Sequence, residues 1–488
     1  MVAVDTVDAA VRAAAASGLA DSSRADRAVW LRALAAALEA DAPALVALAH
    51  RETHLSEARL SGEVVRTAAQ LRFFADVCTE GSYLEATIDT PDPSTIPPRP
   101  DLRRMLRPIG VVGVFTASNF PFAFSVLGND TASALAAGCP VVVKAHPGHP
   151  KLSRRVAELG RTALAAAGAP ADALVLIGAG EDGVEAGVEL IRHPLVRAVG
   201  FTGSTRGGRA LFDIAVSRPD PIPFYGELGS VNPVVVTPRA AQEDAAGLAA
   251  GLAGSFTRDG GQYCTKPGIV FVPAGTGFED ALAVAARGVP GQQLLTGGMT
   301  EAFARGAAAL ATRPDVDAIV APRDGGMGAS EPAVLATSAT AFAADPETFQ
   351  EEHFGPLTLI VRYEDEAPGG DLDTALRVLE GSLTGTVRHA ASDDAALLDR
   401  VTRALAQVSG RVLYDGWPTG VAIAWAQHHG GPWPASTASV HTSVGATAVR
   451  RFLAPVAYQD APQQVLPAEL RDGNPLGIPR REDGVLGG

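Results

Sequence analysis

The stretch IGVVGVFTASNFPFAFSVLGNDTASALAAGCPVVVK, residues 109–144, decides the fold. It opens with a strand-like apolar run at 109–116, continues at 125–137 with a composition that suits a helix, and ends in a valine-rich strand at 140–144. Because a strand, a helix and a second strand follow one another with short connections, the stretch predicts a parallel β-α-β unit.

Residues 108–129 carry no charge and are long enough to suggest a membrane span. Their glycines, together with Asn119 and Pro121, instead favour a strand, a turn and a helix start. The N-terminus shows no pattern of a signal peptide. We therefore expect a cytoplasmic protein without membrane association.

The alternation of strands and helices continues beyond residue 144. We expect helices at 152–167, 184–191 and 206–216, and strands at 174–177 and 198–202. This order is typical of an α/β fold with a parallel sheet covered on both faces. Ligands of such sheets bind at the carboxyl ends of the strands, so we expect one crevice formed by residues 116–120, 144–147, 178–183 and 202–205.

The 488 residues exceed what one hydrophobic core usually serves, so more than one domain is expected. Residues 7–80 have helical periodicity, and residues 90–108 are rich in proline and charge, as in a connector or an exposed hairpin. Alternation resumes after residue 236 and predicts a second α/β domain to about residue 415. The tail from residue 460 is again rich in Pro, Gly and charge.

Composition excludes several classes of protein. The formal net charge of −14 argues against general binding to nucleic acid or anionic membranes, which leaves a small molecule as the expected ligand. Three cysteines do not make a disulfide framework, and no C-x-x-C pair is present. The histidines show no metal-ligand spacing, so we expect no metal.

Two loops are candidates for binding phosphate. Gly178–Gly183 matches G-x-G-x-x-G, but Glu181 and Asp182 within it would repel a pyrophosphate, and a tight turn near the adenosine explains it better. Phe201-Thr-Gly203-Ser204-Thr205 ends a strand and opens a helix, whose free N–H groups attract anions. An ordinary capped helix explains this second match equally well.

Three further residues suggest chemistry, although each has an ordinary alternative. Lys144 ends a strand in a chain with only three lysines, and either holds a ribose or is solvated. Glu227 follows an apolar strand, where burial would make it a base, although most such residues are merely exposed. Cys264 follows two glycines that let N–H groups approach an oxyanion, but composition alone favours an inert buried thiol.

Taken together and in order, these motifs resemble the aldehyde dehydrogenase superfamily. The matching pieces are Thr-Ala-Ser-Asn-Phe-Pro at 116–121, Val-Lys at 143–144, Phe-Thr-Gly-Ser at 201–204, Glu-Leu-Gly-Ser-Val-Asn-Pro at 227–233, Gly-Gln-Tyr-Cys at 261–264 and Glu-His-Phe-Gly-Pro at 352–356. The resemblance runs from about residue 105 to 460. Because six motifs match in the same order along the chain, the family resemblance explains them better than a separate ordinary explanation for each motif.

The resemblance implies a role for each matching residue. Cys264 is the nucleophile, Glu227 is the base that activates water, and the Asn119 amide stabilises the oxyanion with the backbone N–H of Cys264. The hydride acceptor is a nicotinamide cofactor. Its contacts are expected at Thr116, Ser118, Lys144 (adenosine ribose), Pro147, Gly183, Gly203, Ser204 (pyrophosphate), Glu352 (nicotinamide ribose) and Phe354 (beside the ring).

Two positions depart from the family pattern. Ser230 and Val231 replace the Gly-Lys that often follows the base, which leaves Glu227 itself in place. Pro147 stands where many NAD-preferring members have a Glu that binds the ribose hydroxyls. Without that carboxylate a 2′-phosphate is not repelled, so the cofactor is expected to be NADP or NAD, with NADP favoured.

The family fold implied is a Rossmann-like cofactor domain, an α/β catalytic domain and a small oligomerisation hairpin. We assign residues 1–83 and 108–230 to the dinucleotide-binding domain, 84–107 to the connector and hairpin, 231–445 to the catalytic domain and 446–488 to a C-terminal return and tail. A homodimer or homotetramer is expected.

A narrower resemblance is to the 2,5-dioxopentanoate (α-ketoglutarate semialdehyde) dehydrogenase branch. It depends on Lys-Ala-His-Pro-Gly-His-Pro at 144–150, Gly-Gln-Tyr-Cys-Thr-Lys-Pro at 261–267, His-Gly-Gly-Pro-Trp-Pro at 429–434, Thr-Ser-Val-Gly at 442–445 and Arg-Phe-Leu at 451–453. An NADP-dependent fatty-aldehyde dehydrogenase shares some of these features. Arg258 is a candidate for binding the substrate carboxylate, and a solvated Arg is the alternative.

Two readings of another class remain open at this point. One is a Cys-dependent hydrolase or acyltransferase that pairs Cys264 with a histidine, and it would not need Lys144, Ser204 and Glu352. The other is a catalytically silent relative, against which the intact Cys264, Glu227 and Asn119 argue.

Overall fold

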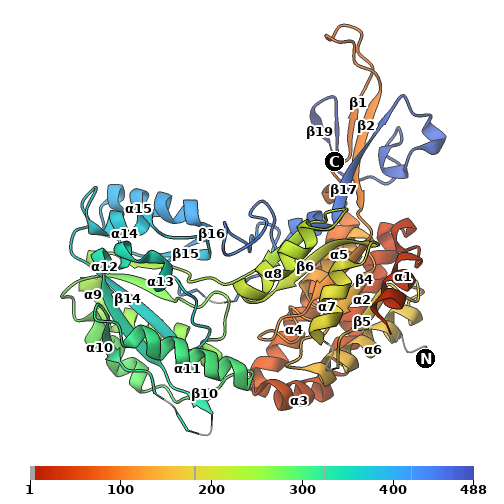
Figure 1. The fold of residues 1–488 in the computed structure, drawn as a ribbon. Helices are drawn as coiled ribbons and strands as arrows, with labels where there is room; N and C mark the ends of the chain where they lie inside the picture. The colour runs from red at the N-terminus through yellow and green to blue at the C-terminus, as the bar shows by residue number, and fades with distance from the viewer. Residues whose placement is uncertain (1–5, 181–182, 324, 327, 419, 488) are drawn as a thin grey trace.

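The computed structural model describes residues 6–180, 183–323, 325–326, 328–418 and 420–487. Two α/β lobes lie side by side, and a third, smaller sheet projects from one of them (Figure 1). Among the described residues, no helix combines the length and the apolar character needed to cross a membrane.

The first lobe is built on a parallel five-stranded sheet with the order β5-β4-β3-β6-β7. Its strands are β3 (Val111–Phe115), β4 (Val141–Lys144), β5 (Leu174–Ile177), β6 (Val196–Thr202) and β7 (Phe224–Glu227). Every residue of β3 is buried, as expected for a central strand covered on both faces. The predicted α/β fold is confirmed.

The helices between these strands follow the predicted order. They are α5 (Asn129–Ala137), α6 (Pro150–Ala166), α7 (Gly183–Arg192) and α8 (Thr205–Val216). Helix α5 begins four residues later than the composition indicated. The carboxylate of Glu63 accepts hydrogen bonds from the backbone N–H groups of Phe122 (2.9 Å) and Ala123 (2.8 Å), which holds this segment as a turn instead of a helix.

Four helices precede the sheet: α1 (Val7–Ala15), α2 (Arg24–Ala40), α3 (Ala42–Thr53) and α4 (Glu57–Glu80). Helix α1 contacts the sheet directly, whereas α2 to α4 pack on α5 and α6. Their starts carry the side-chain caps that helices favour. Ser23 forms a capping box with Asp26, and Thr6 and Ser56 each accept a hydrogen bond from the first turn. These four helices account for the helical periodicity predicted for residues 7–80.

The second lobe contains a seven-stranded sheet with the order β11-β13-β14-β9-β8-β15-β16. All pairs are parallel except β11 with β13. Its strands are β8 (Val234–Val236), β9 (Ile269–Pro273), β11 (Asp317–Val320), β13 (Ala333–Ser338), β14 (Leu357–Tyr363), β15 (Ser382–Arg388) and β16 (Ser409–Tyr414). A separate pair joins β10 (Gln292–Gln293) to β12 (Ala329–Ser330).

Helices cover both faces of the second sheet. They are α9 (Pro238–Phe256), α10 (Phe278–Arg287), α11 (Gly297–Ala311), α12 (Ala339–Ala344), α13 (Pro346–Phe349), α14 (Asp371–Arg377) and α15 (Ala395–Val408). Two apolar cores form, one on each side of the sheet, and alternate residues of β9 and β14 contribute to each.

The third sheet has the order β17-β2-β1-β18-β19. Its strands are β1 (Thr87–Asp89), β2 (Leu102–Pro108), β17 (Leu453–Gln459), β18 (Arg480–Glu482) and β19 (Val485–Gly487). Strands β1 and β2 pair antiparallel and form a hairpin that projects beyond the lobes (Figure 1). The C-terminal tail pairs with this hairpin, because β17 lies along β2 and β18 lies along β1.

The order of strands in the first sheet determines where a ligand can bind. The connection from β3 leads to one side of the sheet and the connection from β6 leads to the other, so a crevice opens beyond the carboxyl ends of these two strands. The loops at 116–119 and 203–205 begin there. The second lobe closes the crevice from the other side, and the cleft between the lobes holds about 1180 Å³ of atom-free space.

Candidate functional site

The loop that carries Cys264 is held in place from two sides. It runs from the 3₁₀ turn Arg258–Gly261 to β9. Gly261 has φ +69°, and a Cβ there would overlap the carbonyl oxygen of Gly355, so this position requires glycine. The side-chain amide of Asn232 donates to the carbonyl oxygens of Cys264 (2.8 Å) and Lys266 (2.9 Å). The thiol is therefore presented on a rigid loop.

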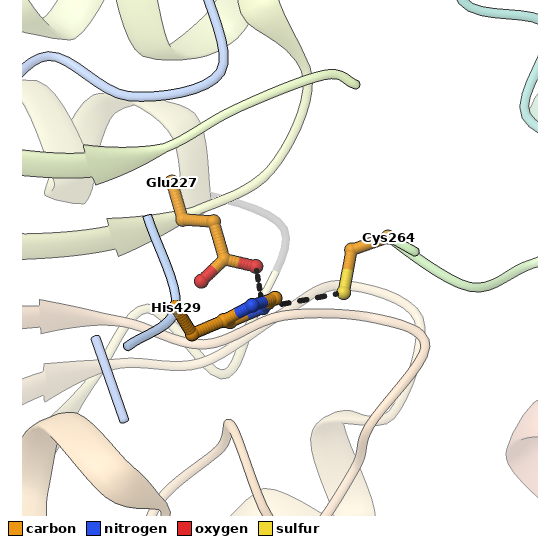
Figure 2. Close-up of side chains that lie close together, drawn as sticks. All are labelled: Glu227, Cys264 and His429. Atoms are coloured by element: carbon orange, nitrogen blue, oxygen red, sulfur yellow. Dashed lines mark hydrogen bonds and ion pairs between the residues drawn. The ribbon is translucent and has the colours of Figure 1, made fainter. Parts of the chain in front are cut away.

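Glu227 ends β7 and lies across the cleft from Cys264. Its side chain is 3% exposed, and both carboxylate oxygens are hydrogen-bonded. Oε1 lies 2.9 Å from Nε2 of His429, and Oε2 accepts a hydrogen bond of 2.5 Å from the hydroxyl of Ser443. The same Nε2 atom lies 3.6 Å from Sγ of Cys264 (Figure 2).

Backbone contacts bring His429 and Ser443 to this position. The segment between them runs beside the end of β7, where the N–H of Leu228 donates to the carbonyl oxygen of Ala435 at 2.8 Å. The hydroxyl of Ser443 and the backbone N–H of His429 both belong to a buried network around Thr442. Neither residue had a role assigned from the sequence, although both lie in motifs of the narrower resemblance, at 429–434 and 442–445.

The contacts of the His429 ring nitrogens differ from those expected in a cysteine hydrolase. A relay of the Cys-His-acid type uses one ring nitrogen for the nucleophile and the other for the acid. Here Nε2 contacts both Cys264 and Glu227, while Nδ1 is buried and has no hydrogen-bond partner among the described residues. An ionised carboxylate can only accept hydrogen bonds. Nε2 of His429 therefore carries a hydrogen and donates the hydrogen bond to Glu227.

The surroundings shift the pKa values of the Cys264 thiol and the Glu227 carboxyl in opposite directions. Burial, with the charge of Glu227, raises the pKa of the Cys264 thiol well above its ordinary value, and Arg66 opposes this. Burial alone would raise the pKa of Glu227, but the charge of His429 and the hydrogen bonds from His429, Ser443 and Cys264 lower it overall. At neutral pH the site thus holds a thiol beside an ionised base.

Asn119 lies at the same end of the cleft. Its side-chain Nδ2 donates one hydrogen bond, of 3.0 Å, to the carbonyl oxygen of Gln262. A primary amide carries two N–H donors, so this bond orients the group and leaves the second N–H to face the cleft that Asn119 and Cys264 both line. An oxygen with developing negative charge would be stabilised there.

The opposite end of the cleft has the features that a dinucleotide requires. Ser204 caps α8 by accepting a hydrogen bond from the N–H of Gly207 at 3.2 Å, and Gly203 and Ser204 are both exposed to the cleft. The start of a helix of this length attracts a pyrophosphate. A Cβ on Gly229 would lie 2.7 Å from Oε2 of Glu352 and 2.7 Å from Oγ1 of Thr205, so glycine leaves room for both side chains. These residues fit a nicotinamide dinucleotide.

Glu352 and Lys266 lie near each other beside this end, where both line one small cavity. Burial raises the pKa of Glu352 to about 7, against the effects of Lys266 and of the Ser230 backbone N–H. Burial lowers the pKa of Lys266 to about 8, and its Nζ donates to the carbonyl oxygens of His353 (2.7 Å) and Leu357 (3.0 Å). Lys266 therefore fixes the loop that presents Glu352 to the cleft.

Phe354 comes from the same loop and reaches across the cleft. Its ring packs against the apolar core of the first lobe, although the residue belongs to the second. Phe354, Ser118 and Glu352 all line the cleft together with Ser204 and Cys264. The structure thus brings together eight of the predicted site residues: Ser118, Asn119, Gly203, Ser204, Glu227, Cys264, Glu352 and Phe354.

Four predicted cofactor residues lie beside the cleft and are not among its lining: Thr116, Lys144, Pro147 and Gly183. Lys144 ends β4, and Thr116 donates its hydroxyl to the Lys144 carbonyl oxygen at 3.2 Å. A Cβ on Gly183 would lie 3.4 Å from Nζ of Lys144, so the two are neighbours. Pro147 is exposed. Glu181 and Asp182 lie outside the described residues.

Two histidines follow Lys144 and differ in their surroundings. His146 lines the cleft, and burial lowers its pKa to about 3, with His149 and Lys144 adding to the effect, so it is uncharged at neutral pH. Both ring nitrogens of His149 have partners inside the protein, Ser153 at 3.1 Å and the Ala117 carbonyl oxygen at 2.9 Å. Of the two, only His146 is placed to meet a ligand.

Three side chains at this end of the cleft also make a set that could hold a metal ion. Ligand atoms of Glu227, Cys264 and His429 all lie within 4.8 Å of one another. Sequence spacing gave no sign of this, because the three residues come from distant parts of the chain. The expectation of a metal-free protein stays a prediction.

Comparison with known proteins identifies the family of the chain. The aldehyde dehydrogenase family model matches residues 2–430. The α-ketoglutaric semialdehyde dehydrogenase 2 of Azospirillum brasilense is 46% identical over 472 residues, which cover 94% of this chain and 87% of that protein. The α-ketoglutaric semialdehyde dehydrogenase of Acinetobacter baylyi is 39% identical over 490 residues, covering 99% and 92%.

Solved structures share the fold at lower identity. An NADP-dependent enzyme from E. coli has a TM-score of 0.77 and 24% identity, covering 93% of this chain and 89% of its own. A 1-pyrroline-5-carboxylate dehydrogenase from Thermus, with bound NAD, has a TM-score of 0.76 and 21% identity, covering 93% and 85%. The family model and the two relatives each match more than four fifths of the sequence, and the chain belongs to the aldehyde dehydrogenase family.

Proposed function

We propose that the chain oxidises 2,5-dioxopentanoate (α-ketoglutaric semialdehyde) to 2-oxoglutarate, with a nicotinamide cofactor as hydride acceptor. The observation that carries this proposal is the 46% identity to an α-ketoglutaric semialdehyde dehydrogenase over 94% of the chain. The arrangement of Cys264, Glu227 and Asn119 supports it, because it supplies a nucleophile, a base and an oxyanion donor at one end of a cleft.

In the first half of the reaction, Sγ of Cys264 bonds to the aldehyde carbon. The thiol is protonated in the resting site, so its proton must leave as the carbon–sulfur bond forms, and the carboxylate of Glu227 accepts it. The aldehyde oxygen becomes an alkoxide, which the Asn119 amide and the Cys264 backbone N–H stabilise. Bound NAD or NADP supplies a nicotinamide ring that accepts hydride from the former aldehyde carbon.

In the second half, a thioester on Cys264 is hydrolysed. Glu227 first releases the proton it received, then accepts a proton from water while the water oxygen bonds to the thioester carbon. The carbon–sulfur bond breaks, the carboxylic acid leaves and the thiol is regenerated. His429 and Ser443 hold the Glu227 carboxylate throughout, since each donates to a different oxygen.

For the cofactor we propose that NADP is used at least as well as NAD. Pro147 leaves no carboxylate at the position where one would repel a 2′-phosphate, and its exposure leaves room for that group. Lys144 adds positive charge nearby. Neutral His146 offers at most a hydrogen bond, so the preference rests on Lys144 and on the absence of repulsion.

For the assembly we propose that the third sheet joins subunits into a homodimer or homotetramer. Ile96 at the end of the hairpin is fully exposed, and Val485 and Leu486 on β19 are also exposed. Exposed apolar side chains on a projecting sheet are typical of a surface covered by a partner. Light scattering coupled to size-exclusion chromatography tests this, and a monomeric mass contradicts it.

The function is tested with a panel of aldehydes, each assayed separately with NAD and NADP. We expect the highest kcat/KM with 2,5-dioxopentanoate and lower values with pentanal and with a long-chain aliphatic aldehyde. A clear preference for the long-chain aldehyde would instead favour the fatty-aldehyde alternative. Hydrolysis of esters without oxidation of any aldehyde would contradict the assignment to a dehydrogenase.

A further inference from the structure

Two arginines in the surroundings of Cys264 have no carboxylate partner among the residues that the structure describes. Arg66 lies on α4, and Arg411 lies on β16. Nη1 of Arg66, and Nε and Nη2 of Arg411, are buried and have no hydrogen-bond partner within the described part of the chain. Neither residue forms an ion pair with another described residue. Buried guanidinium nitrogens normally have a partner, so both sites call for an acceptor that the described residues do not supply.

Arg59 lies two helical turns before Arg66 on the same face of α4. Its guanidinium, unlike that of Arg66, has carboxylate partners. It pairs with Glu63 and with Asp259, and it donates to the Asn119 carbonyl oxygen at 2.9 Å. The second oxygen of Glu63 is occupied by the N–H groups of Phe122 and Ala123. Both oxygens of Glu63 are thus engaged by other donors. Among the described residues, the hydrogen bond of Arg66, of 3.0 Å, goes to the Val421 carbonyl oxygen.

Both arginines belong to the surroundings of the thiol. The guanidinium of Arg66 lies 5.6 Å from the centre of the Phe124 ring, and that ring lies 6.5 Å from the ring of His429. Next to Arg411, a Cβ on Gly410 would overlap the carbonyl oxygen of Gly430, so β16 contacts the residue that follows His429. Burial raises the pKa of Cys264 and lowers that of Arg411. The charge of Arg66 opposes the first effect, and a thiolate on Cys264 would oppose the second.

These cations are separate from the residues that fit the dinucleotide. Neither arginine lines the cleft that contains Ser204, Glu352 and Phe354. Arg258, the candidate from the sequence, is exposed on its 3₁₀ turn and does not line that cleft either. Cys264 lines the cleft and lies within electrostatic reach of both arginines. An anion bound by them would therefore lie beside the thiol, outside the dinucleotide residues.

We propose that Arg66 and Arg411 bind the carboxylate of the substrate while its aldehyde carbon meets Cys264. This inference rests on the proposed function and adds to it the residues that select an anionic aldehyde over a neutral one. The planar guanidinium presents paired N–H donors that match a carboxylate. The adjacent Phe124 contributes an apolar surface for the methylene groups between the two ends of the substrate.

The test compares two aldehydes of the same chain length. kcat/KM is measured for 2,5-dioxopentanoate, which is anionic, and for pentanal, which is neutral, in the wild type and in Arg66→Met and Arg411→Met. We expect each variant to lose about 10-fold to 100-fold with the anionic aldehyde, the usual effect of losing a hydrogen bond to a charged group. Activity with pentanal should be retained. Arg258→Met is the matched control and should behave as the wild type with both.

Two further measurements distinguish loss of the proposed arginine contacts from misfolding of the variants. Arg66→Lys retains the positive charge but lacks the planar, paired N–H donors of a guanidinium. It should recover part of the activity on 2,5-dioxopentanoate. Inhibition by the product 2-oxoglutarate, measured against pentanal, should weaken in both methionine variants. Equal losses on both aldehydes, or no loss on either, would overturn the inference.

Failure of the proposed function would be visible before any variant is made. A wild type that oxidises pentanal but not 2,5-dioxopentanoate contradicts the proposed substrate and the inference together. A wild type that prefers 2,5-dioxopentanoate, with variants that keep this preference, upholds the substrate and overturns only the role of the arginines.

Discussion

Nε2 of His429 lies 2.9 Å from Oε1 of Glu227, although 202 residues separate them in the chain. Both side chains are buried, and the same nitrogen is the one nearest to the thiol of Cys264. His429 thus acts on the carboxylate that serves as the base. The first prediction follows from this contact.

Replacing His429 with Gln should move the acid limb of the pH profile of kcat/KM to higher pH. In the wild type, the donors around Glu227 lower the pKa of its carboxyl despite burial. Loss of the strongest one raises that pKa, so Glu227 becomes protonated, and inactive as a base, at a higher pH. The acid limb of kcat/KM, measured across the pH range in both proteins, shows the displacement. His428→Gln is the control, and an unchanged acid limb in His429→Gln would show that the histidine does not act on the base.

Cys264→Ala should abolish aldehyde oxidation and leave cofactor binding intact. In the proposed mechanism the thiol contacts the aldehyde carbon, whereas the residues proposed to hold the dinucleotide lie around Ser204 and Glu352. NADPH binding is measured by fluorescence titration. Cys139→Ala is the control, because its thiol is buried against the Phe452 carbonyl oxygen at 3.2 Å and lies outside the cleft. Measurable steady-state oxidation by Cys264→Ala would refute the covalent mechanism.

Glu227→Gln should stop steady-state turnover by removing the base for hydrolysis. Rapid mixing with aldehyde and NADP shows whether one equivalent of NADPH still forms. Because the Cys264 thiol is protonated and Glu227 is its nearest base, we expect this first turnover to slow as well. A full-rate first turnover would mean that another group accepts the thiol proton. Normal steady-state turnover would remove Glu227 from the mechanism.

Pro147→Glu should shift cofactor preference toward NAD. A carboxylate at this exposed position repels the 2′-phosphate of NADP and can accept hydrogen bonds from the ribose hydroxyls of NAD. A repulsion of about 1.4 kcal/mol corresponds to a tenfold change in the ratio of the two kcat/KM values. Pro91→Glu adds the same charge in the hairpin and should change nothing. Strict NAD specificity of the wild type would contradict the proposal.

Cofactor affinity should rise as pH increases through about 7, because the pKa of Glu352 is raised to about 7. Below this pH the carboxyl is protonated, and above it the carboxylate accepts hydrogen bonds from ribose hydroxyls more strongly. Calorimetry of NADP binding across this range measures the effect. Glu352→Gln should flatten the dependence, while Glu351→Gln, one residue earlier and exposed, should retain it. An equally steep dependence in Glu352→Gln would assign it to another group.

The sequence alone determined the order of elements and the residues that short motifs carry. Apolar periodicity is a local property, so the strands of the first sheet and their helices were predictable within a few residues. Cys264, Glu227 and Glu352 stand in segments whose residue types are required at fixed spacing. The start of α5 was misplaced, because Glu63 from a distant helix binds the amides of the preceding turn.

Only the tertiary structure brought His429 and Ser443 to Glu227, and Arg66 and Arg411 to the surroundings of Cys264. These contacts join residues from different lobes and loops, and no periodicity or spacing records which of the chain's histidines and arginines will meet a given acid or thiol. Sequence therefore pointed to the exposed Arg258, which is close to Cys264 only along the chain. The choice is made by packing, since burial leaves some guanidinium groups paired with carboxylates, as Arg59 is, and others with nitrogens that have no partner among the described residues.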